Sequence, residues 1–260
     1  MLSKLKSLSW KFKWFAQHYR QISPDTVLLP NRFQGPVNFI SDGVATSNNS
    51  DFLDDYRFQK AYKLAAATSP WKGFEMQWRT YVVCTLAEMV KKLPGDFVEC
   101  GVNTGAYSRA IIEYINFQQT GKIFYLLDTY EGLVPGQITE KEKQAGVGDY
   151  LETYKNVYEQ VVETFSPFNT KIIKGAVPGT LDECTAEQVC YLSIDMNVAE
   201  PEIAAAHYFW NKLVSGAVMI LDDYGFPAHI EQKKAFDAFA KEKGVSILYI
   251  PTGQGIIFKP

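Results

Sequence analysis

The spacing of apolar residues changes near residue 95. Upstream, residues 52–67 and 76–93 carry apolar side chains at the three- and four-residue steps of an amphipathic helix. Pro94 and Gly95 then end the second segment, as expected where a helix gives way to a strand. Downstream, short apolar runs alternate with helical patterns, which is typical of a parallel sheet covered by helices on both faces.

This alternation predicts particular elements. The expected strands are 96–100, 123–127, 171–174, 189–194 and 217–221. The expected helices lie near 105–117, 151–165, 180–186, 200–214 and 229–243. The chain then reads VSILYI, PTGQG and IIFK, a strand–turn–strand pattern that predicts a hairpin. The expected fold class is α/β, with a mostly parallel sheet, a C-terminal antiparallel hairpin strand and an N-terminal helical extension.

The chain divides into three segments by pattern. Residues 1–22 form a basic amphipathic arm, residues 23–94 a connector and helical extension, and residues 95–260 the sheet domain. The arm interleaves apolar and cationic side chains, namely Leu2, Leu5, Leu8, Phe12, Phe15 and Tyr19 with Lys4, Lys6, Lys11, Lys13 and Arg20. Such a helix either packs on its own domain or a partner subunit, or lies on an anionic membrane through residues 1–20. We expect a homo-oligomer.

Composition narrows the class of protein. The 260 residues are 47% hydrophobic and 21% charged, with a net charge of −3. A duplex-binding protein usually carries a basic surface, so we expect no nucleic-acid partner. The four cysteines lack CxxC spacing and lie in apolar runs, which favours buried, reduced thiols. The expected location is cytoplasmic, with peripheral contact at the inner membrane face if the arm binds lipid.

The first expected strand runs into a glycine-containing turn, GDFVECGVNTGAYSRA. The turn lacks the third glycine of a dinucleotide fingerprint, and the chain contains no P-loop. A carboxylate at Glu99, inside the end of the strand, is costly unless something pairs with it. The pattern therefore suits a ligand that bears positive charge, although a tight structural turn would also explain the glycines.

A second acid follows the next strand, where KIFYLLDTYEGL places Asp128 at the strand end. An acid in this position of an open α/β sheet often binds ribose hydroxyls. A helix cap is the alternative explanation for Asp128 alone. Together with Glu99, it favours a nucleoside ligand with a cationic group, which describes S-adenosylmethionine.

Three further acids end the fourth and fifth strands, in YLSIDMN and VMILDDYG. Adjacent parallel strands would bring Asp195, Asp222 and Asp223 to one rim, where their repulsion requires a cation or a proton. Oxygen ligands of this kind suit Mg²⁺. The alternative is that Asp195 caps a loop and the Asp222-Asp223 pair lies in a solvated turn. Asp195 is also a candidate proton acceptor, and His229 is a second candidate base.

At this point the motifs GDFVECGVNTG, FYLLDTYEGL, KGAVPGTLD and ILDDYG together resemble the macrocin O-methyltransferase family. The resemblance covers about residues 75–260. It implies a Rossmann-like class I methyltransferase sheet, S-adenosylmethionine as cofactor, Mg²⁺ as the metal, and a sugar hydroxyl as acceptor in a glycan, glycolipid or glycosylated metabolite. Residues 95–260 would then be the methyltransferase domain.

The resemblance also assigns residues to roles. It places Glu99 and Gly101 in the cofactor loop, Asp128 at the ribose, and Asp195, Asp222 and Asp223 at the metal. We further expect four residues to bind the cofactor, namely Asn103, Gly105, Ser108 and Gly175. One departure is that many relatives carry Asp-Gly-Asp where this chain has Asp195-Met196-Asn197, and another is Val198-Ala199 in place of Leu-Tyr.

The expected reaction is direct methyl transfer. Mg²⁺ would bind two vicinal hydroxyls of the acceptor, and the oxygen would attack the sulfonium methyl group in line. The polar stretch 133–150 is expected to be a lid over the acceptor or, alternatively, a surface insertion. Two other functions remain open: an NAD-dependent oxidoreductase on a similar sheet, and a catalytically silent binding protein with this fold.

Overall fold

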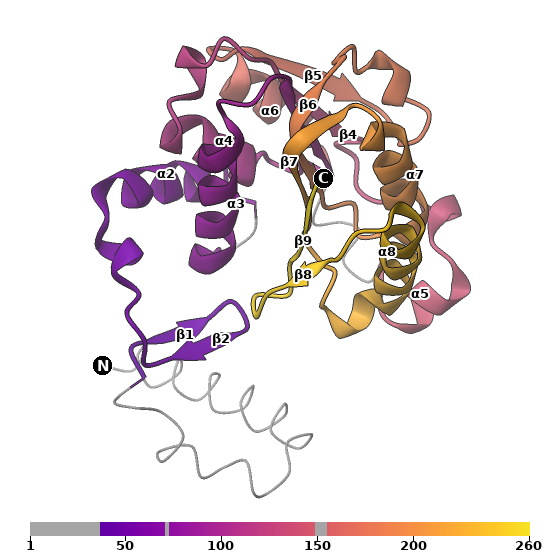
Figure 1. Ribbon diagram of the computed structural model, residues 1–260, viewed down its shortest axis with the longest axis horizontal. Coiled ribbons are helices and arrows are strands. Elements are labelled where there is room, and N and C mark those ends of the chain that lie inside the picture. Colours follow the sequence, from indigo (N-terminus) through magenta and orange to yellow (C-terminus); the bar gives the residue numbers. More distant parts are fainter. Residues whose placement is uncertain (1–36, 71–72, 149–154) are drawn as a thin grey trace, which may run out of the picture. The chain divides into compact units, whose positions relative to one another are not determined.

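The computed structural model describes residues 37–70, 73–148 and 155–260 (Figure 1). The arm expected at 1–22 and most of the connector lie outside the described residues. Residues Ser41–Val44 and Asp51–Pro260 form one compact unit that contains the main sheet. Two short strands, β1 (Phe39–Ser41) and β2 (Val44–Thr46), pair with each other. The domain boundaries drawn at residues 22 and 94 stay predictions.

The main sheet has seven strands in the order β5-β4-β3-β6-β7-β9-β8. Their bounds are β3 Asp96–Cys100, β4 Phe124–Asp128, β5 Thr170–Lys174, β6 Val189–Ile194, β7 Leu213–Leu221, β8 Leu248–Tyr249 and β9 Gly255–Phe258. The strands β3 to β7 pair in parallel, while β9 runs antiparallel to both β7 and β8. The expected fold class is therefore confirmed.

Helices cover both faces of the sheet (Figure 1). They are α2 Tyr56–Ala67, α3 Gln77–Val90, α4 Ala106–Tyr114, α5 Glu140–Gln144, α6 Tyr158–Phe165, α7 Ala199–Trp210 and α8 Ile230–Lys243. Helix α2 begins at Asp55, whose carboxylate accepts a hydrogen bond from the Phe58 amide at 2.7 Å. Helix α8 ends at Gly244, which adopts the left-handed conformation with φ +67°.

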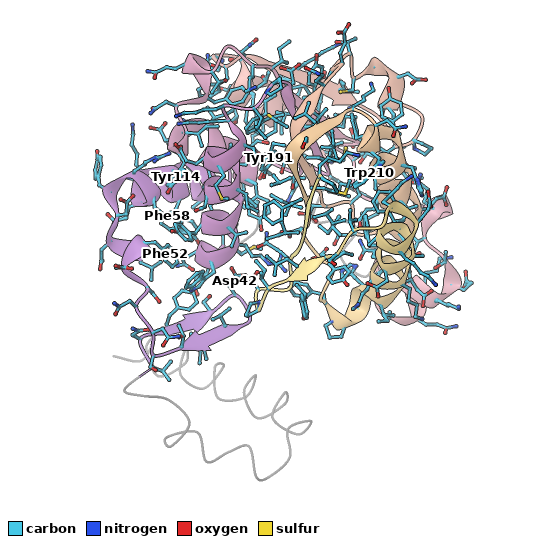
Figure 2. The ribbon with its side chains drawn as sticks, in the orientation of Figure 1. Asp42, Phe52, Phe58, Tyr114, Tyr191 and Trp210 are labelled. Atoms are coloured by element: carbon cyan, nitrogen blue, oxygen red, sulfur yellow. The ribbon has the colours of Figure 1, made fainter. Side chains whose placement is uncertain are left out.

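Alternation along the strands divides the interior into two cores. Phe97 of β3 faces the core shared with α2, α3, α4 and α6, whereas its neighbour Val98 faces the core shared with α7 and α8. Tyr191, labelled in Figure 2, belongs to the first core, and its ring stacks on that of Phe97 with centroids 4.9 Å apart. Each buried aromatic side chain contributes about 2–3 kcal/mol relative to exposure.

Three expected helices differ from the structure. Within the described residues, the helix expected near 151–165 begins only at Tyr158. The segment 180–186 forms only a 3₁₀ turn, Leu181–Glu183, because the Leu181 and Cys184 amides bond to carbonyls three residues back. The helix expected to end at residue 214 ends at Trp210, since Leu213 already pairs with Val189 in the sheet. Tertiary strand pairing overrides the helical pattern at that point.

The stretch expected as a lid or an insertion contains ordered elements over its described part, up to residue 148. It forms a 3₁₀ turn, Pro135–Gln137, and the short helix α5. Thr139 and Glu142 cap this helix reciprocally. Glu142 is buried, and its other carboxylate oxygen accepts from the Ala199 amide at 2.8 Å. The segment is therefore anchored to the start of α7.

Within the described ranges, no helix is both long and apolar enough to cross a bilayer. All four cysteines are free and buried, as expected. Burial raises the pKa of the Cys190 thiol to about 11, which keeps it protonated and unreactive at neutral pH.

Candidate active site

A pocket opens at the carboxyl ends of four adjacent strands. Strands β4, β3, β6 and β7 are neighbours in the sheet, and their ends deliver the five acids Glu99, Asp128, Asp195, Asp222 and Asp223 to the pocket lining. The pocket holds about 1120 Å³ of open space, including its solvent-filled mouth.

The glycines of the first turn are required by close packing of the backbone. Gly101 has φ +90°, and a Cβ atom there would lie 1.8 Å from the Asp195 carbonyl oxygen. Gly105 has φ +82°, and a Cβ atom would lie 2.3 Å from the Phe165 ring. A side chain at Gly101 would push apart the ends of β3 and β6, and one at Gly105 would displace the Phe165 ring of α6. Gly101 lines the pocket, whereas Gly105 does not.

Glu99 is almost completely enclosed, with 2% of its surface exposed. The Ser108 hydroxyl donates a hydrogen bond to its carboxylate. Burial raises the pKa of Glu99 well above its usual range, and the negative charges of Asp128 and Asp222 add to the effect. Glu99 lines the pocket, whereas Ser108 lies outside the lining and orients the Glu99 carboxylate through this hydrogen bond.

Asp128 holds the first turn in place. Its Oδ2 accepts from the Val102 and Asn103 amides at 2.6 and 2.8 Å. Its Oδ1 accepts from the Tyr130 amide at 2.6 Å and from the Thr129 hydroxyl at 3.3 Å. Burial raises the pKa of Asp128, and these hydrogen bonds oppose the rise. The Asp128 carboxylate therefore already accepts hydrogen bonds from the protein, and a ribose hydroxyl would donate to it in addition.

The acids after β6 and β7 converge. One oxygen each of Asp195, Asp222 and Asp223 lies within 4.8 Å of the other two. Burial raises the pKa of Asp195 well above its usual range, and repulsion from Asp222 and then Asp223 adds to it. Burial also raises the pKa of Asp223, again with a contribution from Asp222. The rim is crowded with negative charge, as expected from the sequence.

A buried arginine that the motif search missed lies against this rim. Arg79 of α3 donates from Nη1 to Asp222 Oδ2 at 2.6 Å, and its Nη2 lies 3.9 Å from Asp223 Oδ1. Its Nε lies 3.4 Å from Asp42 Oδ1, and its side chain is only 5% exposed. The sequence held a signal, because Arg79 shares the apolar face of its helix with Val83, Leu86 and Val90.

Two more polar residues absent from the sequence expectations support the acids. Gln254 Nε2 donates to Asp222 Oδ1 at 2.9 Å. Glu202 Oε1 accepts from the Met196 and Asn197 amides, both at 2.9 Å, and so fixes the loop after Asp195. Burial raises the pKa of Glu202 to about 8.

Of the remaining candidate residues, some line the pocket and one, His229, lies outside it. Gly175, Asn103 and Asn197 line the pocket, and Asn197 Nδ2 lies 3.4 Å from Asp195 Oδ1. His229 precedes α8 and lies outside the pocket lining, with its Nε2 3.7 Å from Asp223 Oδ2. The structure thus brings His229 next to the acid rim but not into the pocket lining.

The donor set fits a hard divalent cation. Carboxylate oxygens are the ligands Mg²⁺ prefers, and opposite ligands of Mg²⁺ lie about 4 Å apart. Neighbouring ligands of an octahedral Mg²⁺ lie about 3 Å apart, so the three rim acids would draw together from their present span of up to 4.8 Å to bind one ion. Each Asp222 oxygen already accepts one N–H, but a carboxylate offers about four acceptor positions.

Solved structures with the same fold are methyltransferases. The O-methyltransferase NovP is 18% identical, with a TM-score of 0.62 and coverage of 71% of this chain and 80% of NovP. The calicheamicin methyltransferase CalS11 is 12% identical, with a TM-score of 0.60 and coverage of 86% and 98%. The Podospora anserina methyltransferase PaMTH1, solved with S-adenosylhomocysteine, is 12% identical, with a TM-score of 0.53 and coverage of 79% and 88%.

No curated protein matches the chain. The family described as macrocin O-methyltransferase (TylF) matches residues 45–249, which is most of the sequence and includes every residue of the acid-lined pocket. The chain therefore belongs to the macrocin O-methyltransferase family and is an S-adenosylmethionine-dependent O-methyltransferase.

Proposed function

We propose that this protein transfers a methyl group from S-adenosylmethionine to a sugar hydroxyl in a glycan, glycolipid or glycosylated metabolite, with Mg²⁺ bound at the acid rim. The observation that carries the proposal is the convergence of five carboxylates in one pocket at four adjacent strand ends. The family and its fold neighbours support the acceptor class, since CalS11 is described as a TDP-rhamnose 3′-O-methyltransferase.

The cofactor would occupy the part of the pocket next to the first turn. S-adenosylmethionine carries a sulfonium and an ammonium group, and a pocket lined by carboxylates stabilises both charges. Glu99, Gly101, Asn103, Asp128 and Gly175 line this region. Gly105 and Ser108 would act indirectly, by close packing and by orienting Glu99.

The metal would be held by Asp195, Asp222 and Asp223. When bound, Mg²⁺ lowers the pKa of a coordinated acceptor hydroxyl and fixes its position. Arg79 and Gln254 hold Asp222 so that its oxygens keep one orientation. Glu202 does the same for the loop that carries Asp195.

We assign proton acceptance to Asp195. It lines the pocket at the acid rim, where the acceptor hydroxyl would be held beside the metal. Asn197 occupies the position where many relatives carry a second carboxylate, so it would hold substrate by hydrogen bonds and cannot take the proton. His229 is the second candidate base, and it lies outside the pocket lining, beside Asp223.

Calorimetry tests the proposal at its first step. We expect S-adenosylmethionine to bind in the micromolar range and NAD to give no heat. Binding of NAD alone would favour the oxidoreductase alternative instead. A second assay follows labelled methyl groups into a panel of neutral glycosides, glycolipids and nucleotide sugars, with and without EDTA. Cofactor binding without transfer to any hydroxyl of the panel would support a silent binding protein.

A further inference from the structure

Several buried polar atoms near the acid rim have no hydrogen-bond partner among the described residues, and two of them are hydrogen-bond donors of pocket-lining residues. These two are the Tyr107 hydroxyl and Arg79 Nη2. Tyr107 is 7% exposed and Arg79 is 4% exposed, so bulk water does not satisfy either group. Both residues line the pocket. A buried donor left unpaired costs about 1–3 kcal/mol, so these two groups are available to a polar atom of a ligand in the pocket.

The rest of the Arg79 guanidinium is already occupied. Nη1 donates to Asp222 at 2.6 Å, and Nε donates to the Thr252 carbonyl at 3.2 Å. Of the three guanidinium nitrogens, only Nη2 has no hydrogen bond to a described residue. Its distance to Asp223 Oδ1, 3.9 Å, is too long for one.

Tyr107 approaches the same place from α4. It is the second residue of that helix, which begins directly after the glycine turn. Burial raises the pKa of Tyr107. The negative charge of Asp222 raises it further, and the positive charge of Arg79 opposes the rise, so the Tyr107 hydroxyl interacts electrostatically with both partners of the ion pair. The first turn of α4 also presents the positive end of the helix dipole, which favours an anion.

The charges of the pocket-lining residues indicate which group of S-adenosylmethionine binds beside Arg79. Among the described pocket-lining residues, five are carboxylates and Arg79 is the one cation. S-adenosylmethionine brings two positive groups, which the carboxylates match, and one carboxylate, which they repel. The cofactor carboxylate therefore has one cationic partner in the described lining, the Arg79 guanidinium, which also offsets the negative charge of the neighbouring Asp222 and Asp223.

We propose that Arg79 Nη2 and the Tyr107 hydroxyl together bind the methionine carboxylate of S-adenosylmethionine. Arg79 then joins the two halves of the site, because one guanidinium contacts the cofactor through Nη2 and the metal-facing Asp222 through Nη1. This inference rests on the S-adenosylmethionine dependence of the enzyme.

Decarboxylated S-adenosylmethionine provides the test, since it keeps the sulfonium, the amine and the nucleoside but lacks the carboxylate. Calorimetric titration of the full-length protein should show at least tenfold weaker binding of the decarboxylated compound. Tyr107→Phe should weaken S-adenosylmethionine binding about fivefold while leaving the decarboxylated compound unchanged. Arg79→Lys should also reduce the preference, with thermal unfolding recorded to confirm that the variant is folded.

Tyr130→Phe is the matched control. The Tyr130 hydroxyl is buried, donates to the Leu126 carbonyl at 3.0 Å and lies outside the pocket lining. Its removal should leave the ratio of the two affinities unchanged. Equal affinities of the wild-type protein for both compounds would overturn the inference, as would equal losses for both in Tyr107→Phe. A wild-type protein that binds neither compound would instead contradict the cofactor assignment itself.

Discussion

Arg79 Nη1 lies 2.6 Å from Asp222 Oδ2, and the two side chains are 5% and 4% exposed. This buried ion pair places a fixed positive charge against the acid rim. The repulsion among the rim acids is therefore reduced before any metal binds. Because the pair is buried, loss of one partner leaves the other as an uncompensated charge.

The first prediction concerns this pair. Arg79→Met should lower the free energy of unfolding by about 3–5 kcal/mol, because Asp222 would remain buried without its partner. Adding Asp222→Asn should restore part of that loss. Urea denaturation of both single variants and the double variant measures the coupling. Strictly additive losses would show that the pair does not act as a unit.

The second prediction concerns the metal. Asp195→Asn and treatment with EDTA should both abolish methyl transfer while S-adenosylmethionine affinity changes less than threefold, because the first turn holds the cofactor separately. Asp195 is the better choice for this test than Asp222, whose loss also breaks the ion pair with Arg79. Activity assays and calorimetry give the two readouts. Full turnover in EDTA would remove Mg²⁺ from the mechanism.

The third prediction concerns the cofactor loop. Asp128→Ala should weaken S-adenosylmethionine binding at least tenfold, or about 1.4 kcal/mol. Part of the loss arises because the Val102 and Asn103 amides lose their acceptor, so the turn itself loosens. Faster hydrogen exchange at those two amides in the cofactor-free variant would report the loosening. Unchanged affinity would show that Asp128 serves neither the turn nor the ribose.

The fourth prediction is a pH dependence carried by Asp42 at the hairpin tip (Figure 2). Burial raises the pKa of Asp42 to about 6, against opposing contributions from Arg79. Because the pKa is raised in the folded state, the stability from Asp42 is full below about pH 4 and is lost as the pH rises through about 6.

Asp42→Asn should remove this dependence. Between pH 4.5 and 7.5 the wild-type protein should lose about 1–2 kcal/mol relative to the variant, after allowance for solvent screening. Parallel denaturation curves across this range provide the measurement. A constant difference between the two proteins would mean that Asp42 does not titrate there.

The fifth prediction concerns the amino-terminal arm. Deletion of residues 1–22 should leave the methyltransferase domain folded, because all strands of the main sheet lie beyond residue 95. It should change either the oligomeric state or binding to anionic liposomes. Light scattering and liposome sedimentation separate the two roles. If neither changes, the arm serves neither assembly nor membrane contact.

Local pattern was sufficient to predict the sheet and the positions of its acids. Strand β6, Val189–Ile194, was predicted to the residue, and the five acids were predicted because each directly follows an apolar run. The carboxyl ends of parallel strands meet at one edge of a sheet, so residues far apart in sequence become neighbours without further information. The helical pattern also placed the ends of α6 and α8 at Phe165 and Lys243. It did not place the end of α7, which depended on the pairing of Leu213 with the distant Val189.

The partners of those acids were decided only by the tertiary structure. Arg79 and Asp222 are separated by 143 residues, and Gln254 reaches Asp222 from the C-terminal hairpin. No spacing rule links an arginine in a helix to a particular strand end, because the contact depends on how that helix packs across the sheet. The sequence thus determined where negative charge gathers, while the packing of α3 and of the C-terminal hairpin determined which buried groups balance it.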